Sequence, residues 1–144
     1  MGGARFTGYS AGSHPRAEIH PMTRRVLQKA RMDDRQFQPK HWRDFAGATA
    51  PRLDFVFTLC DRVAQEPCPV WPGQPMTAHW GIEDPTQFVG DEARTLNYFY
   101  RVFTYLDRRV QLFAALPVRA LNRLALQKQL EDIGRVREDA SARV

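Results

Sequence analysis

The stretch that decides the fold is residues 53–59, which read Leu53-Asp54-Phe55-Val56-Phe57-Thr58-Leu59. The unbroken apolar run at its centre is typical of a strand covered on both faces. Around it the sequence predicts a short strand over 5–10, a helix over 21–31, a helical turn over 40–45 and a brief strand over 77–80. This alternation predicts an α/β fold, an open parallel sheet with helices on both faces.

The chain from Asp91 onward is predicted to be helical, because acidic residues favour a helix N-terminus. Apolar residues recur three and four apart in one stripe that we expect to face the core: Leu96, Phe99, Phe103, Leu106, Val110 and Phe113. Pro117 is expected to end this helix and to open a second one. The second helix has a broad apolar side and a plausible stop at Gly134, and residues 135–144 read as a polar tail.

Composition places the chain among globular proteins of one-domain size, with 144 residues, 43% hydrophobic and 26% charged. Its net charge of +5 comes from scattered basic residues with pairs only at Arg24-Arg25 and Arg108-Arg109. This pattern disfavours nucleic-acid binding and suits a solvated surface or a small anionic substrate. Neither a long apolar run nor a secretory leader is recognisable, so we expect no membrane span and a cytoplasmic protein.

Three residues are candidates for chemistry. Cys60 ends the central strand, and Cys68 follows eight positions later in a Pro-rich loop, so a transient disulfide is one interpretation. A small buried side chain at Cys60 with an incidental thiol at Cys68 is the other. Asp84 precedes Pro85, where it can act as a proton donor or merely form an Asp-Pro turn. His79 stands alone, so no metal site is expected.

The loops after Ser10, Leu59 and Trp80 all follow predicted strands. Ligand sites in parallel sheets lie beyond the carboxyl ends of the strands, so these loops are expected to converge there.

Two stretches together carry a family resemblance: TLCD at 58–61 and PCPVWPGQPMTAHWGIEDP at 67–85. They resemble the arsenate reductases built on the low-molecular-weight protein tyrosine phosphatase fold. Residues 9–15 (YSAGSHP) look like that family's second strand and following loop, and residues 53–57 look like its third strand. The ending over 116–134 is similar to a C-terminal extension found in one branch of the family.

The resemblance implies roles for the candidate residues. Asp84 matches the general acid of the Asp-Pro loop, and Cys60 and Cys68 match the cysteines that relay oxidising equivalents after arsenate is reduced to arsenite. It implies an oxyanion substrate, no bound cofactor or metal, and an external thiol reductant, whether thioredoxin, glutaredoxin or a low-molecular-weight thiol. A low-molecular-weight tyrosine phosphatase and a non-catalytic anion- or partner-binding remnant remain alternatives, but a phosphatase has no need of the two cysteines.

The family's nucleophile lies in an N-terminal phosphate-binding loop with a cysteine, five intervening residues and an arginine. In this sequence the position six after Cys60 is Glu66, and that six after Cys68 is Gln74. We therefore expect a fold without its first strand and first helix: a truncated domain at 1–116, a helical extension at 117–134 and a tail at 135–144. A start upstream of Met1 and a shortened, inactive product both fit this pattern. The unpaired strand edges suggest a homodimer.

Overall fold

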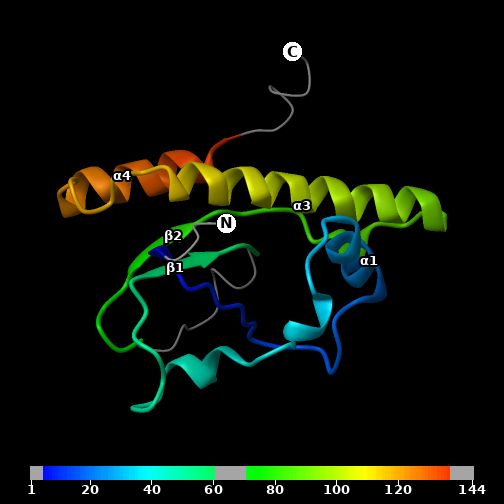
Figure 1. Ribbon diagram of the computed structural model, residues 1–144, viewed down its shortest axis with the longest axis horizontal. Coiled ribbons are helices and arrows are strands. Elements are labelled where there is room, and N and C mark those ends of the chain that lie inside the picture. Colours follow the sequence, from blue (N-terminus) through cyan, green and yellow to red (C-terminus); the bar gives the residue numbers. More distant parts are fainter. Residues whose placement is uncertain (1–4, 61–70, 137–144) are drawn as a thin grey trace.

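The structure is a computed structural model that describes residues 5–60 and 71–136 (Figure 1). Its main elements are α1 (Pro21–Lys29), β1 (Phe55–Thr58), β2 (Met76–His79), α3 (Glu92–Ala114) and α4 (Arg123–Gly134). Single turns of 3-10 helix lie between them: η2 (Asp34–Gln36), η3 (Trp42–Phe45) and η4 (Pro85–Gln87). The order of helices and strands confirms the predicted α/β class.

The two strands form a parallel sheet, in which Phe55 pairs with Met76 and Thr58 pairs with His79. Main-chain pairing continues past β2, because the Ile82 amide donates to the Leu59 carbonyl at 2.8 Å. Both strands were predicted from the sequence, and their parallel arrangement is confirmed. It brings their carboxyl ends to the same edge of the sheet.

The strand predicted over 5–10 is wrong. The segment before α1 has one isolated parallel bridge, between Gly12 and His41, and residues 6–10 have no regular secondary structure. A strand persists only where a neighbour completes its hydrogen-bond ladder, and neither described strand pairs with this segment. Phe6 nevertheless packs against Phe113 at 5.0 Å between ring centroids, so the segment is tied to the core by its side chain.

Aromatic packing joins the sheet to the helices. The rings of Phe55 and Phe57 meet Phe113 of α3 edge to face at 5.0 and 5.2 Å. The Trp80 indole stacks on Phe57 at 3.8 Å and donates a 2.9 Å hydrogen bond to the Leu130 carbonyl of α4. The buried indole thus satisfies its N–H while its ring fills the core.

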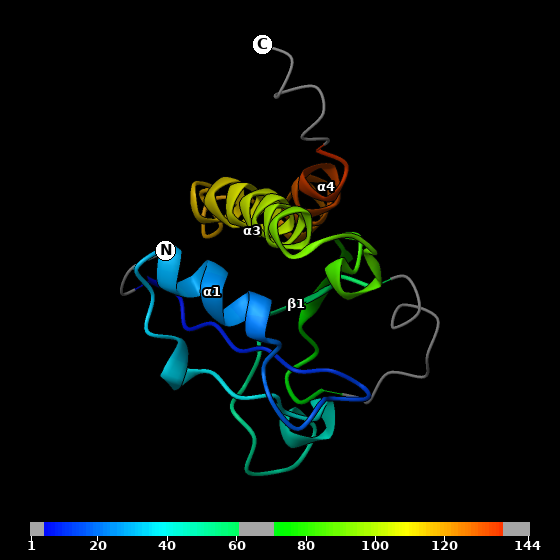
Figure 2. The same ribbon diagram turned by 90° about the vertical axis from the view of Figure 1, so that its right-hand side faces the viewer.

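The two long helices lie side by side over one face of the sheet (Figures 1 and 2). α1 packs against the first half of α3, where His20 stacks on Phe99 at 4.8 Å. The opposite face of the sheet carries the exposed side chains of Thr77 and His79, and no described helix covers it. The expectation of helices on both faces is therefore not met in the part of the chain the structure describes.

The predicted apolar stripe of α3 is buried at Phe99 and Phe113. The second helix begins later than predicted, at Arg123 instead of Pro117. The Asn122 side chain caps it by accepting the Ala125 amide at 2.8 Å, which is a favoured role for asparagine. Residues 117–121 form a turn whose apolar side chains still pack on the core, so their pattern resembled a helix.

α4 ends at Gly134, as predicted, but the reason lies in packing. A Cβ at this position would stand 2.8 Å from the His79 carbonyl oxygen and 2.9 Å from Trp80 Cδ1. Glycine is thus what allows the end of α4 to rest directly on the backbone after β2. No helix among the described residues is long and apolar enough to cross a membrane. The proposed division at residues 116 and 134 stays a prediction.

Candidate functional site

A cavity of about 310 Å³ opens at the carboxyl ends of the two strands. Cys60, two residues beyond β1, and Asp84, five residues beyond β2, both line it. Its other walls come from α1, α3 and the loop after β2, through Thr23, Val26, Leu27, Leu59, Ile82, Glu83, Pro85, Phe99, Val102, Phe103 and Leu106. The structure therefore brings two of the three predicted site residues to one cavity, in the place that parallel strands favour.

The loop that carries Asp84 is fastened to α3 at two points. The buried Arg109 donates to the carbonyl oxygens of Trp80 and Gly81, the second at 3.2 Å, and the Tyr98 hydroxyl donates to the Glu83 carboxylate. Because both anchors belong to the same helix, the main chain from Trp80 to Glu83 is held against α3. The position of Asp84 is thus set by the packing of α3.

The Asp84 carboxylate caps the short η4 helix. Its Oδ1 accepts hydrogen bonds from the Thr86 amide at 2.9 Å and from the Thr86 hydroxyl at 2.7 Å. Burial alone would raise the pKa of Asp84, but these bonds and the nearby Arg16 charge together hold the pKa below its usual range. Asp84 is therefore ionised near neutral pH in this arrangement, whereas a general acid must carry a proton.

An anion placed in the cavity would change that balance. Negative charge beside Asp84 raises its pKa, since two like charges at close range disfavour ionisation. The same residue can therefore cap η4 when the cavity is empty and take up a proton when an oxyanion is bound. The same geometry thus allows Asp84 both roles, that of the Asp-Pro turn and that of the proton donor.

Cys60 presents an exposed thiol, which is free within the described part of the chain. Exposure disagrees with the interpretation of Cys60 as a small buried side chain. Cys68, the third predicted site residue, lies outside the described residues. The relay pair therefore stays a prediction.

The cavity wall is mostly apolar on the side of the helices, with Val26, Phe99 and Val102 among its buried members. None of the described lining residues is Lys, Arg or His, so those residues supply no cation to hold an oxyanion. Among the described residues no group of three or more His, Cys, Asp or Glu could hold a metal ion.

Two arginines matter here that the sequence interpretation did not select. Arg16 follows the loop after Ser10 and acts electrostatically on Asp84, which supports the expected convergence of that loop with the others. Arg109 is 3% exposed and lies three residues after Leu106 and four before Phe113. This spacing puts Arg109 on the same side of α3 as the apolar stripe. A charged residue on that side is the sequence signal of a buried arginine.

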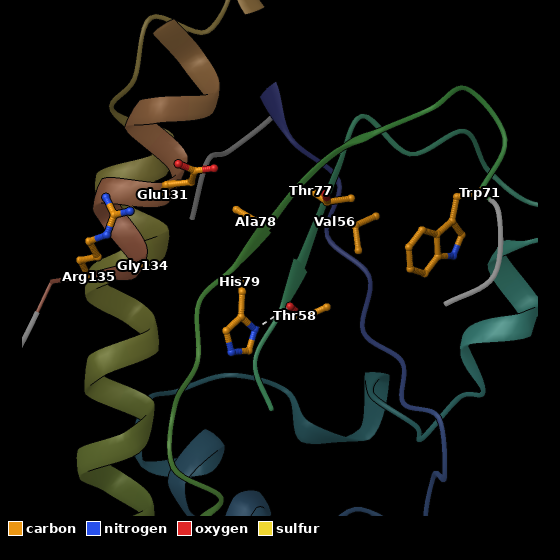
Figure 3. Close-up of a pocket in the computed structure, with 9 residues that line it drawn as sticks. All are labelled: Val56, Thr58, Trp71, Thr77, Ala78, His79, Glu131, Gly134 and Arg135. Atoms are coloured by element: carbon orange, nitrogen blue, oxygen red, sulfur yellow. Dashed lines mark hydrogen bonds between the residues drawn. The ribbon is translucent and has the colours of Figure 1, made fainter. Parts of the chain in front are cut away.

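A second and larger cavity, of about 560 Å³, lies beside the uncovered face of the sheet (Figure 3). Thr58 and His79, the paired last residues of the two strands, line it and join through a 2.7 Å contact between Thr58 Oγ1 and His79 Nδ1. Thr58 is two residues from Cys60, so both cavities reach the carboxyl end of β1.

Comparison with known proteins identifies relatives of this chain. A protein named arsenate reductase from Oceanobacillus iheyensis is 36% identical over 63 residues, which cover 44% of this chain and 45% of that protein. Arsenate reductases from Bacillus licheniformis and Bacillus subtilis are each 36% identical over 61 residues, which cover 42% of this chain and 43% of theirs. The matched part thus spans less than half the length of these relatives.

The family profile described as low molecular weight phosphotyrosine protein phosphatase matches residues 1–129. That match takes in both strands, α1, α3, and the first half of α4. It includes Cys60, Cys68 and Asp84. The chain therefore belongs to the low molecular weight phosphotyrosine protein phosphatase family.

Proposed function

We propose that this chain carries the acid and relay residues of a thiol-dependent arsenate reductase. The observation that supports the proposal most is that Cys60 and Asp84, which follow two different strands, line one cavity at the carboxyl edge of the sheet. The relatives named arsenate reductase agree with it. An oxyanion is the substrate class that the family's chemistry accepts.

In the proposed reaction a nucleophilic thiolate attacks arsenate, and Asp84 gives its proton to the departing oxygen. A relay cysteine then attacks the sulfur bound to arsenic, the S–As bond breaks, and its electron pair leaves with arsenite. Arsenic gains two electrons, and two thiolates become one disulfide. Cys60 and Cys68 pass that disulfide outward, and an external thiol reduces it.

The nucleophile loop is the part that these 144 residues do not contain, because neither cysteine is followed six positions later by arginine. We propose that the 144-residue chain alone neither reduces arsenate nor hydrolyses phosphate monoesters. No described residue lining the smaller cavity offers the cation that such a loop's arginine would supply. Thiol-dependent arsenite formation by the purified chain, above that of a Cys60→Ser, Cys68→Ser double variant, would contradict this.

A tyrosine phosphatase is the alternative enzyme, supported by the name of the matching family. The two activities can be distinguished in an extended version of the chain. This version adds a strand, a loop that holds a cysteine, five residues and an arginine, and a helix. A reductase loses arsenate turnover when Cys68 becomes serine. A phosphatase hydrolyses an aryl phosphate equally well with Cys68 or with serine at that position.

A non-catalytic binding module is the third reading, and one observation favours it. In the described structure β1 pairs with β2 on one side only, so its other edge presents main-chain groups to a further strand. Pairing of two copies through this edge would give the homodimer that the sequence suggested. Sedimentation equilibrium tests it, since a monomer at all concentrations argues against edge pairing.

A further inference from the structure

The outward face of α3 carries three arginines at intervals of seven residues: Arg94, Arg101 and Arg108. Because an α-helix turns about 100° per residue, positions seven apart differ by only about 20°, and the three arginines form a nearly straight row. Arg101 lies about 160° around the helix from the buried Phe99. The row therefore points away from the core, and all three side chains are exposed. Figure 2, which views α3 nearly end on, shows α1 and the sheet below the helix and no described element above it.

The positive charge of the row is largely uncompensated. Arg94 approaches the Asp91 carboxylate at 3.7 Å. Arg101 and Arg108 form no ion pair with any residue that the structure describes. Along α3 itself, no acidic residue occurs at positions 93–106. The charge of these arginines is therefore available to an anionic partner.

Half-buried tyrosines border the row of arginines. Tyr98 and Tyr105 are themselves seven residues apart, and they follow Arg94 and Arg101 by four positions. Alternating intervals of four and three residues are the spacing at which one α-helix contacts another along its length. The Tyr98 ring stacks on Phe88 at 4.7 Å between centroids, so its position is fixed by the fold. The arginines and tyrosines together form a basic and aromatic seam along α3.

The dimensions of the seam restrict the kind of anion that fits it. Successive arginines are about 10.5 Å apart along the helix axis, and the row from Arg94 to Arg108 is about 21 Å long, far beyond the reach of a small oxyanion. Side chains on one face of an extended strand repeat every 6.8 Å or so, which does not match this interval. One strand of duplex nucleic acid turns by more than half a revolution over about 21 Å and so leaves a straight row. Carboxylates seven residues apart on a second α-helix repeat at the same interval of about 10.5 Å and stay in line with the arginines.

We propose that this seam of α3 is a docking surface for an acidic amphipathic helix of another protein. Carboxylates of the partner helix pair with the three arginines, and its apolar side chains cover the rings of Tyr98 and Tyr105. The same seam of a second copy does not fit, because its arginines would meet the row with like charge. The proposal is independent of the arsenate chemistry, since no residue of the seam lines the cavity of Cys60 and Asp84.

The test is calorimetric titration of the full chain, at low salt, with an acetylated and amidated peptide of three LAAEAQA heptads. This peptide presents leucine and glutamate at the two seam positions of a helix, and saturable binding is expected. Arg101→Gln combined with Arg108→Gln should weaken binding about fivefold, because each exposed ion pair contributes about a factor of two. Arg43→Gln combined with Arg119→Gln removes the same charge from exposed positions outside α3. This matched control should bind the peptide as the unchanged chain does.

Further arms separate the proposal from general attraction between opposite charges. A peptide of three LAAQAQA heptads, which lacks the carboxylates, should bind more weakly, and binding of the acidic peptide should weaken in 0.5 M NaCl. The inference is overturned by the absence of saturable binding, by equal weakening in the two double variants, or by equal affinity for both peptides. Tighter binding of a single-stranded oligonucleotide or of anionic phospholipid vesicles, lost with Arg101 and Arg108, would assign the row to a different partner and also overturn it.

Discussion

Arg109 on the buried face of α3 donates a hydrogen bond to the main-chain oxygen of Gly81, at 3.2 Å from Nη1. The same guanidinium also reaches the carbonyls of Trp80 and Val136, so one side chain joins α3, the loop that leads to Asp84 and the chain after α4. A cation buried in this way is shared by three carbonyl dipoles. It connects the residues just after α4 to the candidate site.

Replacing Arg109 with methionine should destabilise the protein. Methionine keeps most of the volume, but the Trp80 and Gly81 carbonyls lose a charged donor, and unmet buried acceptors cost about 2 kcal/mol in unfolding free energy. Urea denaturation measures the change. Arg108→Met, on the exposed side of the same helix, is the control and should change stability little. Equal stability of both variants would show that the hydrogen bonds of Arg109 to the Trp80 and Gly81 carbonyls do not stabilise the fold.

Gly134→Ala should also destabilise the fold, against the usual helix preference for alanine. Alanine would gain up to about 1 kcal/mol in helix propensity, but its Cβ would meet the His79 oxygen at 2.8 Å. Overpacking of this kind costs about 1–3 kcal/mol, so a net loss is expected. Gly47→Ala, where nothing lies within 4 Å of the added Cβ, is the matched control in thermal unfolding. A higher melting temperature for Gly134→Ala would refute the close contact.

The pKa of Asp84 is lowered in the folded chain, so its contribution to stability depends on pH. The contribution is fully present above the unfolded pKa of about 3.8 and is lost as pH falls through the lower folded value. Asp84→Ala should therefore lower unfolding free energy at pH 7, by about 0.5 kcal/mol for a lost cap, and have less effect near pH 2. A carboxyl resonance of Asp84 that titrates above 4 would contradict the lowered pKa.

Phosphate or arsenate should move that titration upward in a chain completed with the nucleophile loop. An anion held near Asp84 repels its ionised form, so the carboxyl should protonate at higher pH when the cavity is occupied. The measurement is the Asp84 carboxyl titration by NMR with and without phosphate. Asp33, whose carboxylate pairs with Arg35 and which does not line this cavity, serves as the internal control and should titrate alike in both samples.

Much of the fold followed from local sequence signals. The apolar run at 55–57 predicted strand β1, and the proline at position 21 predicted the start of α1. The shared cavity of Cys60 and Asp84 could be anticipated because parallel strands end at one edge. Each of these features depends on a residue's own preferences or on a rule of topology.

Features that depend on distant partners were not recoverable. Residues 5–10 have the composition of a strand, yet a strand needs a neighbour, and sequence does not show whether one is beside it. The start of α4 is a different case, because the Asn122 cap that sets it is a local signal, which Pro117 outweighed in the sequence prediction. The larger cavity joins β1, β2, Trp71 and α4, a combination no short pattern reveals.

The proposed function depends above all on Cys60 and Cys68, which are proposed to relay the electrons that reduce arsenate. Its most direct test exposes the loop-completed chain to arsenate without external thiol, alkylates the remaining thiols and maps the peptides by mass spectrometry. We expect a Cys60–Cys68 disulfide or a disulfide from either of them to the loop cysteine, formed one for one with arsenite. Arsenite formed in that amount while Cys60 and Cys68 are both fully alkylated would contradict it.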